Sequence, residues 1–185
     1  MSRIRRILHP TDFSPASSAA FRRALELARA NRAELVLVHV LPATPLDVEK
    51  VFAWEERKAE IRSLQAEHQL GIPRADDEDS PSAKRVFEGP FTQEVLDEFS
   101  PEGRAWAKMV DAWAGRAYNA GAKVRPILRV GIPYQEILAA ARESTADLVV
   151  LATHGRGEIP RLLVGSVADR VIRMAPCPVF TLREV

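Results

Sequence analysis

The sequence predicts an α/β fold in which helices cover both faces of a doubly wound, five-stranded parallel sheet. Two runs, residues 34–41 (ELVLVHVL) and 147–152 (DLVVLA), are apolar almost throughout, which is typical of strands buried on both faces. Segments with helical periodicity separate the expected strands. This alternation favours parallel strands joined by right-handed crossovers.

The first three elements form a strand–helix–strand unit. Residues 4–9 are a short apolar run interrupted by arginines, and we expect the first strand here. Ser14 then supplies a good N-cap residue, and Pro15 suits the first position of a helix. Small and apolar side chains recur at helical spacing after this point, at Ala16, Ala20, Ala24, Leu27 and Ala28. The run at 34–41 completes the unit.

The second half of the chain repeats this rhythm. A third strand is predicted at 124–130, but Pro126 cannot donate a ladder hydrogen bond, so we place this strand at an edge of the sheet. Pro133 begins the helix that follows. The remaining elements are a strand at 147–152, a helix at 166–174 and a fifth strand at 177–182.

Residues 43–100 fit the alternation poorly, and we expect them to form an extended insertion in a single domain that covers residues 1–185. Residues 46–68 are charged and compatible with a helix, whereas residues 70–90 combine proline, glycine and acidic side chains, which predicts a mobile loop. A further helix is expected at 101–119. Its apolar face would carry Trp106, Met109, Val110 and Trp113, and helical spacing favours a core position for the tryptophans over stacking on a base.

The composition argues against several classes of partner. The formal net charge of +1 provides no general attraction to nucleic acid or to an anionic membrane. Cys177 is the single cysteine, so it has no internal disulfide partner, and a reducing compartment fits best. No run approaches the about 20 apolar residues that span a bilayer. We expect a cytoplasmic protein that binds neither nucleic acid nor membrane.

The loops that follow the expected strands carry the candidate ligand-binding residues. Parallel α/β sheets bind ligands beyond the carboxyl ends of their strands, at the point where the strand order reverses. Pro10, Thr11 and Asp12 follow the first strand. Because Ser14 already serves as the helix cap, Asp12 is available to accept hydrogen bonds, for instance from ribose hydroxyls.

A phosphate site is predicted between the fourth strand and the last long helix. Gly155 permits the close approach of a ligand. Gly165 and Ser166 begin the helix, where backbone N–H groups, a hydroxyl and the positive end of the helix dipole favour phosphate. Arg156 lies between them and adds positive charge. The alternative is that Gly165 only ends a turn and Ser166 only caps the helix, and the pattern alone favours neither interpretation.

No catalytic residue is predicted. His39 alternates within an apolar strand and is expected to be a core histidine. His154 lies in the candidate loop, but neither a carboxylate nor a nucleophile accompanies it at a recognisable spacing. The common motifs of P-loop NTPases, dinucleotide-binding dehydrogenases, esterases and zinc proteases are absent from the sequence.

Two motifs resemble those of the universal stress proteins. Residues 6–14 (RILHPTDFS) resemble the opening of that family. Residues 151–155 (LATHG), followed after nine residues by 165–168 (GSVA), resemble its ATP-binding signature, and residues 175–179 (APCPV) resemble the entry to its last strand. The resemblance covers residues 4–42 and about 120–183. The signature normally begins with glycine where this chain has Ala152, the smallest replacement.

The resemblance implies the strand order 3-2-1-4-5 of the Rossmann-like adenine nucleotide alpha hydrolase-like fold, with the proline-bearing strand at an edge. It also implies that ATP binds with Mg²⁺ or Mn²⁺, with Asp12 at the ribose, the backbone of Val40 at the adenine, and the glycine loop at the phosphates. The full set of candidate nucleotide contacts is Pro10, Thr11, Asp12, Val40, Ala152, His154, Gly155, Arg156, Gly165, Ser166 and Val167.

The function that follows is that of a regulatory stress-response protein acting through ATP occupancy and dimerisation. A slow magnesium-dependent ATP hydrolase and an interaction module without nucleotide are the alternatives. The lack of a placed base argues against the hydrolase, and the intact spacing from Gly155 to Gly165 argues against the module. The apolar strand at 178–182 is expected at a sheet edge, which favours a homodimer through this strand. The insertion is a candidate lid or a surface for a protein partner.

Overall fold

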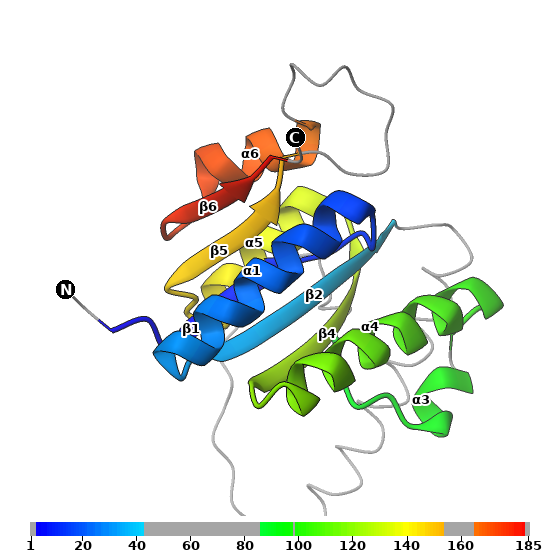
Figure 1. Cartoon of the computed structure of the whole chain (residues 1–185). Coiled ribbons are helices and arrows are strands. Elements are labelled where there is room, and N and C mark those ends of the chain that lie inside the picture. Colours follow the sequence, from blue (N-terminus) through cyan, green and yellow to red (C-terminus); the bar gives the residue numbers. More distant parts are fainter. Residues whose placement is uncertain (1–2, 43–85, 98, 154–164, 184–185) are drawn as a thin grey trace, which may run out of the picture.

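Six strands form one mostly parallel sheet with helices on both faces (Figure 1). The computed structural model describes residues 3–42, 86–97, 99–153 and 165–183. The strands are β1 (Arg6–Pro10), β2 (Glu34–Pro42), β3 (Val86–Glu88), β4 (Lys123–Gly131), β5 (Leu148–Ala152) and β6 (Val179–Leu182). The helices are α1 (Pro15–Asn31), α3 (Gln93–Asp97), α4 (Pro101–Asn119), α5 (Pro133–Glu143) and α6 (Ser166–Met174). None of these helices is long and apolar enough to cross a membrane.

The strand order is β3-β4-β2-β1-β5-β6. All neighbouring pairs are parallel except β3 and β4, which are antiparallel. The five parallel strands follow the predicted order 3-2-1-4-5, so the α/β class and the doubly wound arrangement are confirmed. The predicted strand number was wrong, because β3 makes the sheet six-stranded and mixed.

The placement of the strand with Pro126 at the sheet edge was also wrong, because β3 pairs outside β4. The β3–β4 register covers Ile127 to Arg129 and stops short of Pro126. The carbonyl of Pro126 accepts a hydrogen bond from Gly89 N (3.0 Å), so the backbone of Pro126 faces β3. The missing N–H of this proline therefore lies where regular pairing ends, and it costs no hydrogen bond to β2.

The predicted mobile loop at 70–90 was wrong at its carboxyl end. Residues 86–88 form β3, which buries Phe87, and the segment that follows packs on the sheet through three buried side chains, Phe91, Leu96 and Phe99. The rest of that loop, together with the helix expected at 46–68, lies outside the described residues.

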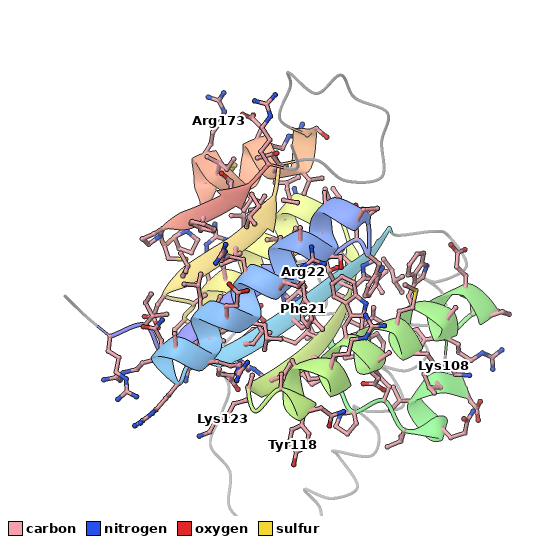
Figure 2. The ribbon with its side chains drawn as sticks, viewed as in Figure 1. Phe21, Arg22, Lys108, Tyr118, Lys123 and Arg173 are labelled. Atoms are coloured by element: carbon pink, nitrogen blue, oxygen red, sulfur yellow. The ribbon has the colours of Figure 1, made fainter. Side chains whose placement is uncertain are left out.

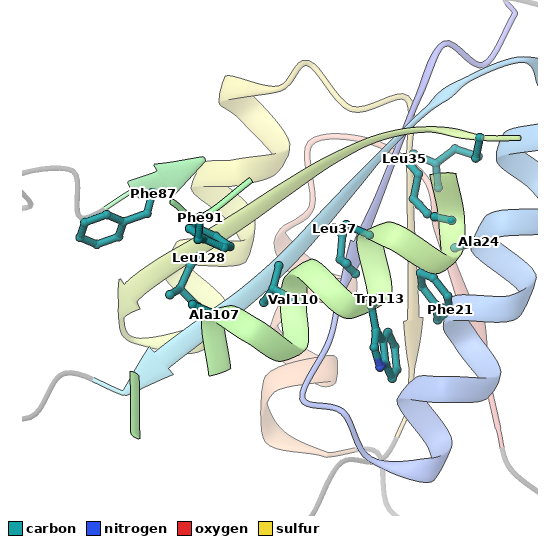
Figure 3. Close-up of a cluster of buried hydrophobic side chains, with 14 of the residues drawn as sticks. Phe21, Ala24, Leu35, Leu37, Phe87, Phe91, Ala107, Val110, Trp113 and Leu128 are labelled. Atoms are coloured by element: carbon teal, nitrogen blue, oxygen red, sulfur yellow. The ribbon is translucent and has the colours of Figure 1, made fainter. Parts of the chain in front are cut away.

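Both faces of the sheet are buried. Leu35 and Leu37 of β2 face α1 and α4, and in this layer Phe21 and Trp113 meet between the two helices (Figure 3). The alternate residues of β2 face α5 and α6, in a second cluster that includes Val36, Val38, Ile137, Val149 and Val171. Charged residues such as Arg22, Lys108 and Arg173 lie on the exposed sides of α1, α4 and α6 (Figure 2).

The helix boundaries follow local sequence signals. The Oγ atom of Ser14 accepts a hydrogen bond from Ser17 N (3.1 Å), which confirms the predicted cap of α1. Helix α4 spans the predicted residues 101–119 and buries Val110 and Trp113. Met109, which the sequence places on the same face, is 37% exposed.

Candidate functional site

The strand order reverses between β1 and β5. From β1 the chain passes to β2 on one side, whereas β5, which is reached through α5, pairs with the other side of β1. The loops after β1 and β5 therefore leave in different directions, and we call the region at the carboxyl ends of these strands, where α/β sheets bind ligands, the crevice. The N-terminus of α6 lies at the same edge, because Gly165 N donates to Thr153 O (2.7 Å) directly after β5. The described candidate residues from the two halves of the chain thus meet at one edge of the sheet.

Thr11 shapes the turn between β1 and α1, which comprises residues 11–14. Its N–H donates to Val38 O (2.8 Å), and its carbonyl accepts from His39 Nδ1 (2.7 Å). Its Oγ1 accepts from Phe13 N (3.0 Å) and hydrogen-bonds Ser17 Oγ (2.8 Å). The side chain is buried, so Thr11 stabilises the turn through hydrogen bonds on its buried side.

Asp12 is held in a defined orientation at the centre of this turn. Its Oδ1 accepts a hydrogen bond from Ser14 N (3.0 Å), as in an Asx-turn. Ser14 caps α1, as the sequence predicts. One carboxylate oxygen of Asp12 also serves the turn, and the availability of Asp12 to a ligand stays a prediction. The side chain is partly exposed, and the hydrogen bond fixes the direction in which its negative charge points.

Val40 directs its backbone towards the crevice. Val38 O accepts from Thr11 N, so the backbone groups of Val38 face β1. Backbone groups alternate in direction along a strand, so those of Val40, two residues further on, face the same way. The register pairs Pro10, the last residue of β1, with Val38, and Val40 therefore lies beyond the end of β1.

The first turn of α6 presents backbone N–H groups at the same edge. Gly165 is the N-cap, and no side-chain hydrogen bond caps the helix among the described residues. Ser166 occupies the first helical position and is exposed, so the alternative that Ser166 is the cap was wrong. Gly165 has φ −58° and ψ 146°, values open to any L-residue, so its dihedral angles do not require glycine.

The structure describes some of the remaining candidate residues and not others. Ala152 ends β5 and is partly buried, and Val167 is exposed in the first turn of α6. Three candidates, His154, Gly155 and Arg156, lie outside the described residues.

His9 is a residue at this edge to which the sequence reasoning gave no role. Its buried imidazole joins the two strands that flank the crevice, because Nδ1 donates to Val150 O (2.8 Å). Burial lowers the pKa of His9 to about 4, and this effect outweighs the opposing influence of the Val150 carbonyl and of Asp12. The imidazole is therefore neutral at physiological pH. His39 is also buried, as predicted for a core histidine.

No group of three or more His, Cys, Asp or Glu side chains gathers closely enough to hold a metal ion in the part of the chain that the structure describes.

Comparison with known proteins establishes the family. The model of the universal stress protein family matches residues 3–183. The chain belongs to this family. Universal stress protein MJ0577 of Methanocaldococcus jannaschii is 26% identical over 180 residues, which cover 97% of this chain and 95% of the relative. The family predicted from the two sequence motifs is thus confirmed.

Solved structures agree with the universal stress protein fold. The structure of MJ0577 has a TM-score of 0.62 at 22% identity and covers 100% of this chain and 99% of its own. A universal stress protein in complex with cAMP has a TM-score of 0.59 at 23% identity, covering 98% of each chain. The universal stress protein of Archaeoglobus fulgidus in complex with dAMP has a TM-score of 0.50 at 18% identity, also covering 98% of each chain. These TM-scores support the shared fold.

Proposed function

We propose that this universal stress protein binds ATP with Mg²⁺ or Mn²⁺ at the carboxyl ends of β1 and β5, and that nucleotide occupancy regulates it. The observation that carries the proposal is the convergence of three groups at one edge: the oriented carboxylate of Asp12, the backbone of Val40 and the N-terminus of α6. Two family members with similar folds are complexes with adenine nucleotides, cAMP and dAMP, which supports the ligand class.

Each group suits one part of the nucleotide. The backbone N–H and C=O of Val40 match the acceptor and donor on the edge of adenine. Asp12 would accept hydrogen bonds from the ribose hydroxyls. Gly165, Ser166 and Val167 would offer N–H groups to phosphate at the positive end of α6. The sequence motif adds Pro10, Thr11, Ala152, His154, Gly155 and Arg156 to the proposed contacts, and the buried Thr11 would act by shaping the turn.

Calorimetric titration of the purified protein with ATP, GTP and AMP, in the presence of Mg²⁺, tests this proposal. We expect ATP to bind much more tightly than GTP, because guanine presents a donor where adenine presents an acceptor and an acceptor where adenine presents a donor. AMP should bind more weakly than ATP, since it lacks two of the phosphates. Equal affinities for ATP and GTP would contradict adenine recognition by Val40.

Regulation is proposed in preference to ATP hydrolysis. The two described histidines at this edge, His9 and His39, are buried, and each donates its Nδ1 hydrogen to a backbone carbonyl. Neither is thus presented as a general base for water. A timed assay of ADP release tests this choice, and multiple turnovers per minute would favour the hydrolase. Mass spectrometry of the denatured protein, as purified, would test the interaction module, which should carry no adenine nucleotide.

We further propose that the protein acts in the cytoplasm in a stress response, as a homodimer assembled through β6. The exposed outer edge of β6 supports the assembly, since β6 is the last strand in the sheet order among the described residues.

A further inference from the structure

Phe13 adopts a backbone conformation that requires support. Its φ is +61°, in the left-handed region that a bulky residue rarely enters. The residue lies between Asp12 and Ser14, so its dihedral angles determine where the Asp12 carboxylate points. Such conformations persist when the surrounding structure holds them in place.

Rings from two other elements surround Phe13. The indole of Trp106, on α4, stacks on it with the centroids 5.7 Å apart and the planes inclined by 11°. Trp113, two turns further along the same face of α4, meets it edge-on at 5.0 Å, and His39 of β2 lies 4.9 Å away. These separations fall within the favourable range for aromatic pairs.

Trp106 is also linked to the backbone on both sides of Asp12. Trp106 lies 5.0 Å from His39, whose Nδ1 donates to Thr11 O (2.7 Å). Phe13 N in turn donates to Thr11 Oγ1 (3.0 Å). Trp106 therefore contacts the two residues, Phe13 and His39, that hold the backbone before and after Asp12.

Trp106 and Trp113 differ in their surroundings. Trp113 is buried and packs against Phe21 (4.7 Å) in the core between α1 and α4. Trp106 is only partly buried. Removal of the Trp106 side chain should therefore destabilise the fold less than removal of the Trp113 side chain. The effect of the Trp106 ring on the turn can thus be measured separately from the stability of the core.

We propose that Trp106 is a positioning residue for the nucleotide site: its indole holds Phe13 in the left-handed conformation and thereby fixes the Asp12 turn, so that nucleotide affinity depends on α4. The inference rests on the proposed adenine-nucleotide function. It goes beyond that function because it assigns control of affinity to a residue on a helix that supplies no proposed nucleotide contact.

A double-mutant cycle tests the inference. Trp106→Ala should weaken ATP binding on the order of tenfold, the size expected when a hydrogen bond involving a charged group is lost. Trp106→Phe, which keeps a ring, should retain most of the affinity. Glycine adopts positive φ without support, so in a Phe13→Gly background the change Trp106→Ala should have little further effect. Tyr118→Ala, which removes a 73% exposed ring from the same helix, is the matched control and should bind as wild type does.

An equal loss of affinity from Trp106→Ala in both backgrounds would overturn the inference, since Trp106 would then act by another route. NMR separates this failure from failure of the proposed function, because backbone couplings and carbon shifts of Phe13 report its φ without any ligand. We expect Phe13 to leave the left-handed region in Trp106→Ala and to keep it in Trp106→Phe and Tyr118→Ala. A positive φ at Phe13 in Trp106→Ala would refute the positioning role whether or not the wild type binds ATP.

Discussion

Burial of His9, a residue of β1 that hydrogen-bonds to β5, should make the free energy of unfolding depend on pH. The pKa of this histidine is about 4 in the folded chain, below the ordinary value of 6.5. Above pH 6.5 the imidazole is neutral in both states and contributes no pH dependence. Between pH 6.5 and 4 only the unfolded chain binds the proton, so the free energy of unfolding falls as the pH falls. The loss by pH 4 should be roughly 3 kcal/mol, since one pKa unit corresponds to about 1.4 kcal/mol.

Urea unfolding of wild type and His9→Gln at several pH values checks this prediction. Glutamine can donate to Val150 O but does not titrate, so the difference in unfolding free energy between the two proteins should change between pH 6.5 and 4. A difference that stays constant over this range would show that His9 is not responsible. Hydrogen bonds from Arg5 N and Arg6 N lower the pKa of Asp147, whose contribution is lost only at more acidic pH, below 3.8.

Gly165 is a position where a substitution should separate nucleotide binding from folding. Its extended dihedral angles accept valine, and loss of the preferred N-cap residue should cost only about 1 kcal/mol. We expect Gly165→Val to remain folded but to lose nucleotide binding, because the branched side chain would fill the space proposed for phosphate. Ser166→Ala should weaken binding less, by about 1.5–3 kcal/mol for one hydroxyl bonded to a charged group. Calorimetry beside circular dichroism checks both, and full affinity of a natively folded Gly165→Val would exclude this phosphate site.

Sequence reasoning at the residue scale succeeded where the signal is local. Ser14 as a cap follows from its position before Pro15, and the core role of His39 follows from its place in an apolar strand. The conformation of Phe13 and the pKa of His9 could not be predicted in this way. Both involve side chains distant in sequence, because Trp106 of α4 stacks on Phe13 and the rings of Phe21 and Trp113 lie beside the buried imidazole of His9.

At the scale of elements, a buried arginine connects β4 to α5. The guanidinium of Arg129, 2% exposed, donates to Glu136 O (3.0 Å) and to Glu143 Oε2 (2.7 Å), and its Nε lies 3.5 Å from Glu136 Oε2. The side chains of Glu136 and Glu143 are 19% and 42% exposed, so water can reach the carboxylates but hardly reaches the guanidinium.

Because water reaches the carboxylates but hardly reaches the guanidinium, we expect removal of the carboxylates and removal of the guanidinium to lower stability by different amounts. The double variant Glu136→Gln with Glu143→Gln leaves the buried positive charge without a compensating negative charge and should destabilise by about 3 kcal/mol. Arg129→Met leaves two carboxylates that water can solvate, and should cost only about 1–2 kcal/mol. Denaturant unfolding of both variants measures the difference. A larger loss in Arg129→Met would mean that the guanidinium contributes mainly through packing.

The elements themselves were largely predictable, because each has a local signature. Valine-rich runs gave β2 and β5, and proline after a good cap gave the start of α1. The short strand β3 lacks such a signature, because three residues are too few for a periodic pattern and the preceding segment is acidic and rich in proline. The buried aromatic residues Phe87, Phe91 and Phe99 are the signal that would have distinguished this segment from a loop.

At the scale of the whole molecule, the two edges of the sheet differ. At one edge β3, which comes from the middle segment at 43–100, pairs with β4, and α3 of the same segment lies against α4. At the other edge β6 pairs with β5, and no further strand follows in the order of the described residues. The described part of the middle segment thus lies at the edge opposite β6 and does not cover that strand.

The register of β6 identifies the atoms available to a second copy of the chain. Val149 N donates to Pro178 O (3.0 Å) and Thr153 N donates to Leu182 O (2.9 Å), so the even-numbered residues of β6 face β5. Val179 and Thr181 then direct their backbone groups outward. Phe180, 43% exposed, adds an apolar side chain beside this edge. A twofold axis would pair β6 with its copy in antiparallel fashion, in the closed symmetry that is commonest among homo-oligomers.

We therefore predict that wild type is a dimer by light scattering and that Thr181→Pro is a folded monomer. Proline removes the outward N–H of Thr181 but leaves the ladder to β5 intact, so it should abolish pairing between copies while circular dichroism stays native. Thr181→Val changes the same side chain, keeps the N–H and should remain dimeric. Phe180→Lys should weaken the dimer by placing like charges across the twofold axis. Leu182 is unsuitable for such a test, because it packs against the core on the α1 side. A monomeric wild type, or a dimer that survives Thr181→Pro, would exclude β6 as the interface.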